Sequence, residues 1–335
     1  MYKTFIIAEA GVNHNGSLKT AKKLVDAAKA AGADAIKFQT FKAEALATRS
    51  APKAKYQKIS AKKESQLEML KKLELSEAEF KELFKYCKQK GIIFLSTPFD
   101  EESAEFLNQL GVSKFKIGSG DVTNVPLLKR IAGYKKPIIL STGMSTLKEV
   151  REAVRVIYSA GNKKVSLLHC TSNYPARYGD VNLKAMETLR EIFKVPVGYS
   201  DHTLGIEMAV AAVAMGARVI EKHFTLNNNF KGPDHKVSLE PKEFKQMVQA
   251  IRKTETAMGD GIKRPRGSEL EVAKVARKSI VAACNIPEGV IITKAMLTVK
   301  RPGTGLKPRF LNKVIGRKAK FDIPKDELLS WSAIQ

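Results

Sequence analysis

The sequence predicts an α/β fold, a (β/α)8 (TIM) barrel of parallel strands, followed by a small β-rich domain. Apolar, β-rich runs recur eight times in the first 225 residues, and helical patterns lie between them. Nearly continuous hydrophobic runs are typical of parallel strands that are buried on both faces. Near residue 262 this pattern changes to shorter β runs that are broken by Pro and Gly turns. Eight strands that alternate with helices indicate a barrel, and the change of pattern indicates a second domain.

The predicted strands are short and evenly spaced, with one exception. They cover 5–11, 35–41, 92–99, 114–120, 137–143, 164–171, 197–202 and 219–225. Two of the helical segments between them end at Gly32 and Gly161, as expected for helix C-termini. A doubly wound open sheet is the alternative, but no GxGxxG motif follows the first run, which disfavours it.

The exception is the connection between the second and third strands, which is about 50 residues long. Its segment 42–75 begins as a basic, alanine-rich loop and continues into a helical pattern. Long loops at the C-terminal face of a barrel often form lids or substrate walls. A plain surface elaboration is the equally weighted alternative.

The sequence divides into a barrel over 1–261, a linker over 262–276 and a C-terminal domain over 277–335. The linker is polar, carries Pro265 and Gly267, and includes a short helical pattern. The tail holds β runs separated by turns such as IPEG and RPGTG. About sixty residues suffice for an independent but marginally stable domain.

Composition indicates a cytoplasmic protein. The chain has 335 residues, of which 44% are hydrophobic, so it can bury a large core. No apolar run is long enough to cross a membrane, and the N-terminus lacks the features of a signal peptide. Three widely separated cysteines fit a reducing compartment better than a disulfide framework.

The formal net charge of +24 comes mostly from lysines scattered over polar helix faces. There is no arginine-rich arm, zinc finger or RNA-binding aromatic signature. We therefore expect a solvated basic surface and no nucleic-acid partner. A non-catalytic, basic polyanion-binding protein is the alternative from a different class.

Every predicted strand ends in polar residues, where barrel enzymes build their active sites. His202 and His223 end the last two strands and are the candidate ligands for a divalent metal. Hydrogen-bonded core histidines are the alternative. His14 is expected at the rim, His169 as a buried, satisfied histidine, and His235 over the site.

Lys37 and Lys116 lie on separate strands among apolar neighbours, where a buried ammonium needs an anionic partner. Hydroxyl groups follow on nearby strand ends, so lysines and hydroxyls form a predicted cradle for a phosphate or carboxylate. Structural pairing of the lysines with Glu9 or Glu221 is the alternative. Glu9 itself is a candidate for orienting a hydroxyl group or activating water.

Several motifs, taken together, resemble one enzyme family, the sialic acid synthases, also called N-acetylneuraminate or nonulosonate synthases. The C-terminal segment with KRPGTG resembles the antifreeze-like (SAF) domain of that family. The resemblance covers essentially the whole chain in order. It is carried by FIIAEAGVNHNGS, KFQTF, FLSTPFD, KIGSGD, LSTGM, LLHCTSNYP, GYSDHT and EKHFT.

The resemblance implies a transferase that condenses phosphoenolpyruvate with open-chain N-acetylmannosamine and releases phosphate, an N-acetylneuraminate synthase. It implies a divalent cation, usually Mn²⁺ with Mg²⁺ or Co²⁺ as alternatives, held by His202 and His223. It further implies a homodimer in which the C-terminal domain of one subunit closes the site of the other, with Arg301 offered to the acylamino group.

The remaining residue assignments also follow from the resemblance. Glu9, Lys37 and Lys116 match catalytic positions. Phosphoenolpyruvate-binding or sugar-binding positions are matched by Gln39, Thr97, Ser119, Ser141, Ser172, Tyr174, Ser200, Glu221 and Asp234.

The sequence departs from the N-acetylneuraminate branch of the family at three positions. That branch has histidines where this chain has Phe38 and Phe41, and asparagine where it has Ser172. Apolar residues suit a deoxygenated sugar, so a legionaminic or pseudaminic acid synthase that uses a 2,4-diacetamido-2,4,6-trideoxy hexose is the alternative. The phenylalanines could equally face away from the site.

Overall fold

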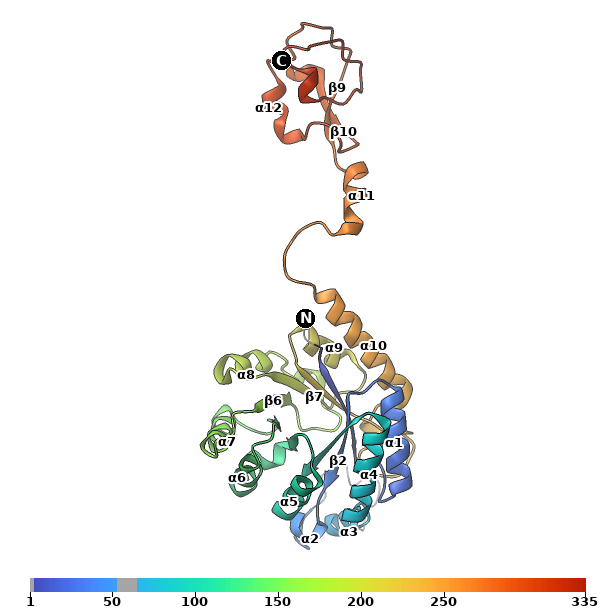
Figure 1. Cartoon of the computed structure of the whole chain (residues 1–335), viewed down its shortest axis with the longest axis vertical. Helices are drawn as coiled ribbons and strands as arrows, with labels where there is room; N and C mark the ends of the chain where they lie inside the picture. The colour runs from blue at the N-terminus through green and yellow to red at the C-terminus, as the bar shows by residue number, and fades with distance from the viewer. Residues whose placement is uncertain (1–2, 53–64) are drawn as a thin grey trace. The chain divides into compact units, whose positions relative to one another are not determined.

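The computed structural model describes residues 3–52 and 65–335, and these form two compact units, Met1–Gly259 and Asp260–Gln335 (Figure 1). Each unit has a hydrophobic core of its own. The first is an eight-stranded parallel barrel surrounded by helices, which confirms the predicted fold. The segment expected to be a linker, 262–276, contains helix α11, Gly267–Ala276.

All eight predicted strands are present, and their boundaries differ from the prediction by at most three residues. The hydrogen-bonded order is β3-β2-β1-β8-β7-β6-β5-β4, all parallel, and β3 and β4 lie against each other to complete the ring. β4 is the shortest because a 3-10 turn over Ser119–Asp121 follows it almost at once. The strands are β1 Phe5–Gly11, β2 Ala35–Thr40, β3 Ile93–Pro98, β4 Phe115–Ile117, β5 Ile138–Ser141, β6 Val165–Cys170, β7 Val197–Asp201 and β8 Val219–His223.

Helices connect the strands and cover the outside of the barrel (Figure 1). Many begin at a side chain that accepts a backbone N–H, such as Ser76 before α4 and Thr146 before α7. The connection between β2 and β3 holds two extra short helices, α2 and α3. The helices of the first unit are α1 Leu18–Ala30, α2 Ala43–Leu46, α3 Gln66–Lys71, α4 Glu77–Lys90, α5 Glu101–Leu110, α6 Val125–Gly133, α7 Leu147–Ser159, α8 Ala185–Phe193, α9 Glu207–Ala214 and α10 Pro241–Met258.

The inside of the barrel has an apolar layer near the strand starts and a polar layer near their ends. Ile7, Ala35, Leu95, Ile139, Leu168 and Val219 form the apolar layer. Since side chains alternate along a strand, the residue two positions further on points inward as well. Those residues are Glu9, Lys37, Thr97, Ser141, Cys170 and Glu221. The apolar layer thus supports a floor of polar side chains at the C-terminal face.

The second unit is small and β-rich, as the sequence predicts. β9 (Ser279–Ala282) pairs antiparallel with β10 (Leu297–Lys300), and isolated bridges such as Ile286 with Ile323 extend the pairing. A short helix, α12 (Leu311–Val314), packs on the same core. No helix in the described parts of the chain is both long and apolar enough to span a membrane.

We expect Gly198→Ala to destabilise the barrel. A Cβ at Gly198 in β7 would clash with the Val219 carbonyl oxygen and lie 2.7 Å from Leu168 Cδ2. Overpacking of this kind costs about 1–3 kcal/mol, which urea denaturation should detect. Gly133→Ala, at a helix end with open space around it, is the matched control and should change stability by less than about 1 kcal/mol. Equal stabilities for the two variants would contradict this packing.

Candidate active site

A cavity of about 500 Å³ opens at the C-terminal end of the barrel. It is lined by all fourteen of the candidate site residues that belong to the first unit. These are Glu9, Lys37, Gln39, Thr97, Lys116, Ser119, Ser141, Ser172, Tyr174, Ser200, His202, Glu221, His223 and Asp234. The fifteenth candidate, Arg301, lies in the second unit, where it is exposed and its Nε donates to the Ala276 carbonyl at 3.1 Å.

Glu221 holds the centre of this cavity between the two lysines. Its Oε1 lies 3.5 Å from Lys37 Nζ and 3.6 Å from Lys116 Nζ, and Ser200 Oγ donates to it at 3.0 Å. All four side chains are buried. Glu221 Oε2 is buried without a hydrogen-bond partner among the described residues. It therefore remains an acceptor for a bound molecule.

Glu9 lies on β1, the strand next to β8, and contacts Lys37, one of the two lysines near Glu221. Lys37 Nζ lies 2.9 Å from Glu9 Oε2, and Gln39 Nε2 donates to Glu9 Oε1 at 3.4 Å. The register of β1 and β2 places Glu9 directly opposite Lys37. The structural alternative for the lysines, pairing with carboxylates, is thus observed, and the paired lysines line the cavity as well.

The two carboxylates differ in pKa because their surroundings differ. Burial raises the pKa of Glu9 to about 7, against the opposing charge of Lys37. Burial also raises the pKa of Glu221, but Lys116 and Lys37 outweigh it and bring that pKa down to about 2. Glu221 is therefore a permanent anion, while Glu9 can exchange a proton near neutral pH.

Hydroxyl groups on neighbouring strands are oriented by N–H donors. Lys37 donates to Thr97 Oγ1 at 3.2 Å, and Lys116 donates to Ser141 Oγ at 2.7 Å. The Gly143 N–H donates to Ser119 Oγ at 2.9 Å. An accepted hydrogen bond leaves each hydroxyl proton available for donation. The lysines and these hydroxyl groups can thus form an anion-binding surface.

His202 and His223 line the same cavity with their ring centroids 5.5 Å apart. His202 Nδ1 lies 2.8 Å from the Thr171 carbonyl oxygen, which can only accept, so Nδ1 carries the proton and Nε2 holds a lone pair. His223 Nδ1 is buried without a partner in the described part of the chain. Burial lowers the pKa of both imidazoles, which favours the neutral, metal-binding form.

These features fit a divalent cation held by two imidazoles. Residues 3–52 and 65–335 contain no cluster of three or more His, Cys, Asp or Glu side chains with metal-binding geometry. Asp201, the carboxylate beside His202, points away and pairs with Lys222. A cation here would take its remaining ligands from water or substrate oxygens, as in an open catalytic site.

One wall of the cavity is apolar. A substrate wall was one of the two alternatives for the segment 42–75, but its apolar character was not predicted. The wall comes largely from α3 and the turn after it, within the long segment 42–75, whose part 53–64 lies outside the described residues. Phe41 packs behind this wall, and Phe38 packs against Phe94 in the outer layer. The wall consists of Val12, Leu46, Met69, Leu70, Leu73 and Phe99.

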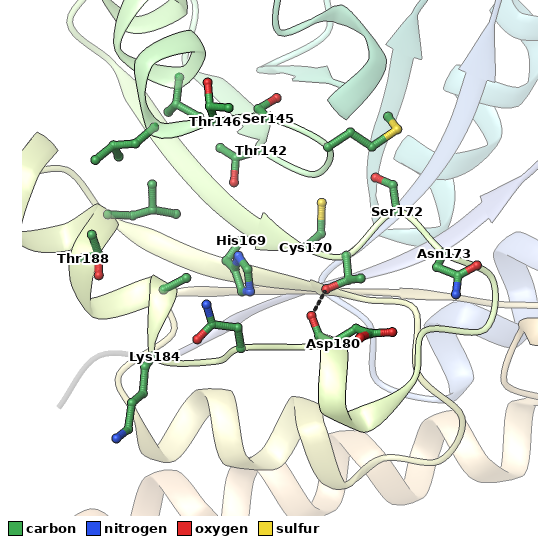
Figure 2. Close-up of a pocket in the computed structure, with 17 residues that line it drawn as sticks. Thr142, Ser145, Thr146, His169, Cys170, Ser172, Asn173, Asp180, Lys184 and Thr188 are labelled. Atoms are coloured by element: carbon green, nitrogen blue, oxygen red, sulfur yellow. Dashed lines mark hydrogen bonds between the residues drawn. The ribbon is translucent and has the colours of Figure 1, made fainter.

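A second cavity, of about 760 Å³, adjoins the first (Figure 2). It lies between the start of α7 and the segment that leads into α8, and Thr171 Oγ1 donates to the Asp180 carbonyl at 3.2 Å along its floor. Met144, Cys170 and Ser172 line both cavities. Cys170 was not predicted, although the strand alternation from Leu168 could have found it.

Two histidines lie elsewhere than expected. His14 is buried next to Phe38 and accepts the Gly16 N–H, rather than lying at the rim. His235 is buried behind the loop that carries Asp234, with Nδ1 2.6 Å from Thr225 Oγ1. His169 is satisfied by the Val181 carbonyl, 2.6 Å from its Nε2, as expected.

Comparison with known proteins identifies the family. The NeuB family model matches residues 24–263, and the SAF domain model matches residues 277–335. The chain belongs to the NeuB family. It is 52% identical to N,N'-diacetyllegionaminic acid synthase of Campylobacter jejuni, over 98% of this chain and 99% of that protein.

Two further relatives of this NeuB-family protein share 37% of its sequence. The pseudaminic acid synthase of Campylobacter jejuni is 37% identical over 99% of this chain and 97% of its own. Human N-acetylneuraminate-9-phosphate synthase is 37% identical over 97% of this chain and 91% of its own. The solved structure of an N-acetylneuraminic acid (sialic acid) synthetase from Leptospira borgpetersenii, in complex with citrate, superposes with a TM-score of 0.72 at 36% identity. That superposition covers 80% of this chain and 90% of the other.

We expect Asp234 to make folding stability depend on pH. Burial raises its pKa from 3.8 to about 6, against the opposing charge of Lys37. The folded protein therefore holds a proton that the unfolded chain releases, and this contribution is lost as pH rises from about 4 through 6. The loss is on the order of 3 kcal/mol.

Urea denaturation of the wild type and Asp234→Asn between pH 4 and 8 measures this effect. The stability difference should grow with pH in favour of Asp234→Asn and level off above about pH 7. Parallel stability profiles would contradict the raised pKa.

Proposed function

We propose that this protein is a synthase of the legionaminic acid type. It condenses phosphoenolpyruvate with a 2,4-diacetamido-2,4,6-trideoxy hexose and releases phosphate. The observation that carries this proposal is the 52% identity over almost the whole chain with a protein of that name, against 37% for the pseudaminic acid and N-acetylneuraminate-9-phosphate synthases. The identities favour this sugar over the N-acetylmannosamine that we inferred first from the sequence.

The apolar wall supports a deoxygenated sugar. A trideoxy hexose with two acetamido groups presents three methyl groups, whereas N-acetylmannosamine presents one. Burial of methyl groups against Met69, Leu70 and Leu73 is favourable, and burial of an unpaired hydroxyl there is costly. Phe38 and Phe41 act only indirectly, since they pack behind the lining.

The reaction forms one C–C bond and breaks one C–O bond. The methylene carbon of phosphoenolpyruvate attacks the aldehyde carbon, and the aldehyde oxygen takes up a proton. Water adds to the central carbon of the former enolpyruvate. The bond between that carbon and the phosphate oxygen then breaks, and phosphate leaves with the electron pair.

The residues divide this work between charge and proton transfer. Lys37 and Lys116 bind the phosphate and carboxylate of phosphoenolpyruvate together with the hydroxyl groups of Thr97, Ser119, Ser141, Ser172 and Ser200. Glu9 has a pKa of about 7, so it can accept the proton of the attacking water. The sugar would contact Gln39, Tyr174, Glu221 and Asp234, which line the same cavity.

His202 and His223 are the proposed ligands of a divalent cation, Mn²⁺ in first place with Mg²⁺ and Co²⁺ as alternatives. A bound cation supplies Lewis-acid polarisation of the aldehyde oxygen. The neutral imidazoles and the orphan His223 Nδ1 support this assignment.

Phosphate release from phosphoenolpyruvate tests the proposed function. The assay uses Mn²⁺ and a panel of N-acetylmannosamine, its 6-phosphate and 2,4-diacetamido-2,4,6-trideoxy hexoses. We expect preference for a diacetamido sugar by about tenfold or more in kcat/KM, which corresponds to about 1.4 kcal/mol. Chelator treatment, or His202→Ala, should abolish turnover.

Two outcomes of this assay would contradict the proposal. Turnover confined to N-acetylmannosamine would restore the N-acetylneuraminate synthase reading. Absence of phosphate release with every sugar would favour a basic polyanion-binding protein, which a steep salt dependence of DNA binding would support.

We further propose a cytoplasmic homodimer in which the SAF domain of each subunit offers Arg301 to the partner's sugar. The free state of Cys87, Cys170 and Cys284 supports a reducing compartment. The exposed position of Arg301 in a unit with its own core supports a role outside that unit. The functional division remains a barrel over 1–261, a linker over 262–276 and the SAF domain over 277–335.

We expect Arg301→Ala to lower kcat/KM for the acylamino sugar by tenfold or more, because a charge-assisted hydrogen bond to the sugar is lost; such bonds contribute about 1.5–3 kcal/mol. The affinity for phosphoenolpyruvate and the melting temperature of the barrel should stay unchanged. Arg309→Ala removes another exposed arginine of the same unit and is the matched control. Full activity of Arg301→Ala, or of a chain lacking 277–335, would rule out the contribution of this domain.

A further inference from the structure

Directly behind the two candidate metal ligands lies a fully buried ion pair. Lys222 Nζ is 2.7 Å from Asp201 Oδ2, and both side chains have no exposed surface. Asp201 precedes His202 at the end of β7, and Lys222 precedes His223 at the end of β8. The two residues are direct cross-strand partners.

The pair belongs to a closed hydrogen-bonded ring around His202. Thr203 donates to Asp201 Oδ1 twice, from its N–H at 2.9 Å and its hydroxyl at 2.7 Å. Lys222 Nζ also donates to the Thr203 carbonyl oxygen at 2.6 Å. The backbone on both sides of His202 is thereby tied to the residue before His223.

This ring lies on the opposite face of the strands from the cavity. Side chains alternate along a strand, so Ser200 and Glu221 face inward while Asp201 and Lys222 face the helices. The further charges that act on Lys222 belong to Glu207 in α9 and Glu243 in α10, which is the outer side of the barrel. No atom of the ring needs to touch substrate or metal.

Stability alone does not account for such a pair. Removing two charges from water costs free energy that their attraction seldom exceeds, and apolar replacements of similar size are often neutral or stabilising. A buried ion pair does impose a defined geometry, because each of its donors and acceptors needs a hydrogen-bond partner. Here that geometry sets the separation of the strand ends that carry the two imidazoles.

We propose that the Asp201–Lys222–Thr203 ring is a positioning device that holds His202 and His223 at the spacing required for binding a divalent cation. This inference rests on the metal site within the proposed function. The three residues are positioning residues, because they act through the histidines. Their loss should weaken cation binding more than it weakens the fold.

Mn²⁺ binding to the full chain, measured by the electron paramagnetic resonance of free Mn²⁺, tests this role. Asp201→Asn/Lys222→Met removes both charges together, so neither is left buried alone. Thr203→Val removes only the hydroxyl group and keeps the ion pair. The matched control is Asp34→Asn/Arg252→Met, which removes a half-buried ion pair (Arg252 Nη2 to Asp34 Oδ2, 3.0 Å) just before β2 and far from the strand ends.

We expect the double variant to raise the Kd for Mn²⁺ by about 10- to 100-fold, the range found when the partners of metal ligands are lost. Thr203→Val should raise it several-fold. The control should keep its Kd within about twofold while it loses melting temperature. The absorption spectrum of bound Co²⁺ should change in the ring variants only, because it reports ligand geometry.

A Kd within about twofold of the wild type, in a folded double variant, would overturn the inference. If the double variant does not fold, Thr203→Val decides by the same criterion. A wild type that binds neither Mn²⁺ nor Co²⁺ would also overturn it. A wild type that binds Mn²⁺ but releases no phosphate with any sugar would refute the proposed function and leave this inference standing.

Discussion

The shared contact of Glu221 with Lys37 and Lys116 is the interaction on which the candidate site depends. Three buried charges from three strands meet within 3.6 Å, above a layer of Ile, Leu, Val and Ala side chains. None of them could stay ionised there alone, because isolated buried charges are strongly disfavoured. Glu221 stabilises the charge of both lysines, and Lys37 pairs in addition with Glu9, whose pKa nevertheless stays raised by burial. The orientation of two hydroxyl groups depends on the lysines in turn, because Lys37 donates to Thr97 and Lys116 donates to Ser141.

Charged side chains lie on both faces of the strand pair β7–β8, and the two faces have different roles. On the inner face, Glu221 lies with the cavity lysines and keeps an oxygen without a partner. On the outer face, Asp201 and Lys222 bond to each other and to Thr203, and neither lines the cavity. An incompletely satisfied polar network can accept a ligand, whereas a completely satisfied one mainly fixes geometry. The same type of contact thus supports binding on one side and positioning on the other.

The barrel, its strand boundaries and most of its cavity could be predicted from the sequence, because the alternation of side chains is visible there. Lys37 and Glu221 follow the apolar residues Ala35 and Val219 by two positions, so their inward direction can be read from the sequence. The sequence could not decide whether the segment 42–75 forms a wall of the cavity, because the placement of Met69, Leu70 and Leu73 in this long connection depends on tertiary packing. Asp201 directly precedes His202 along the chain but points away from the cavity and pairs with Lys222, because neighbours on a strand face opposite sides. The proposed role of Arg301 rests on family resemblance, because neither its sequence context nor the fold of its own unit indicates which site it would contact.

The charge balance of the cavity gives a physical reason for a divalent cation. Two lysines line it, Lys37 and Lys116, with three carboxylates, Glu221, Glu9 and Asp234. The raised pKa values of Glu9 and Asp234 keep this set near neutral, so the net charge of +24 resides elsewhere on the molecule. Phosphoenolpyruvate brings a carboxylate and a phosphate into this balanced set, and repulsion from Glu221 would oppose its binding. Protonation of Glu9, whose pKa is about 7, removes part of that repulsion. A cation at His202 and His223 would remove more, because these imidazoles are kept neutral by burial and add no charge of their own. The lysine-rich surface is therefore not evidence about the reaction. Because the cavity itself is nearly neutral, a cation at the two histidines would supply the positive charge that favours binding of phosphoenolpyruvate.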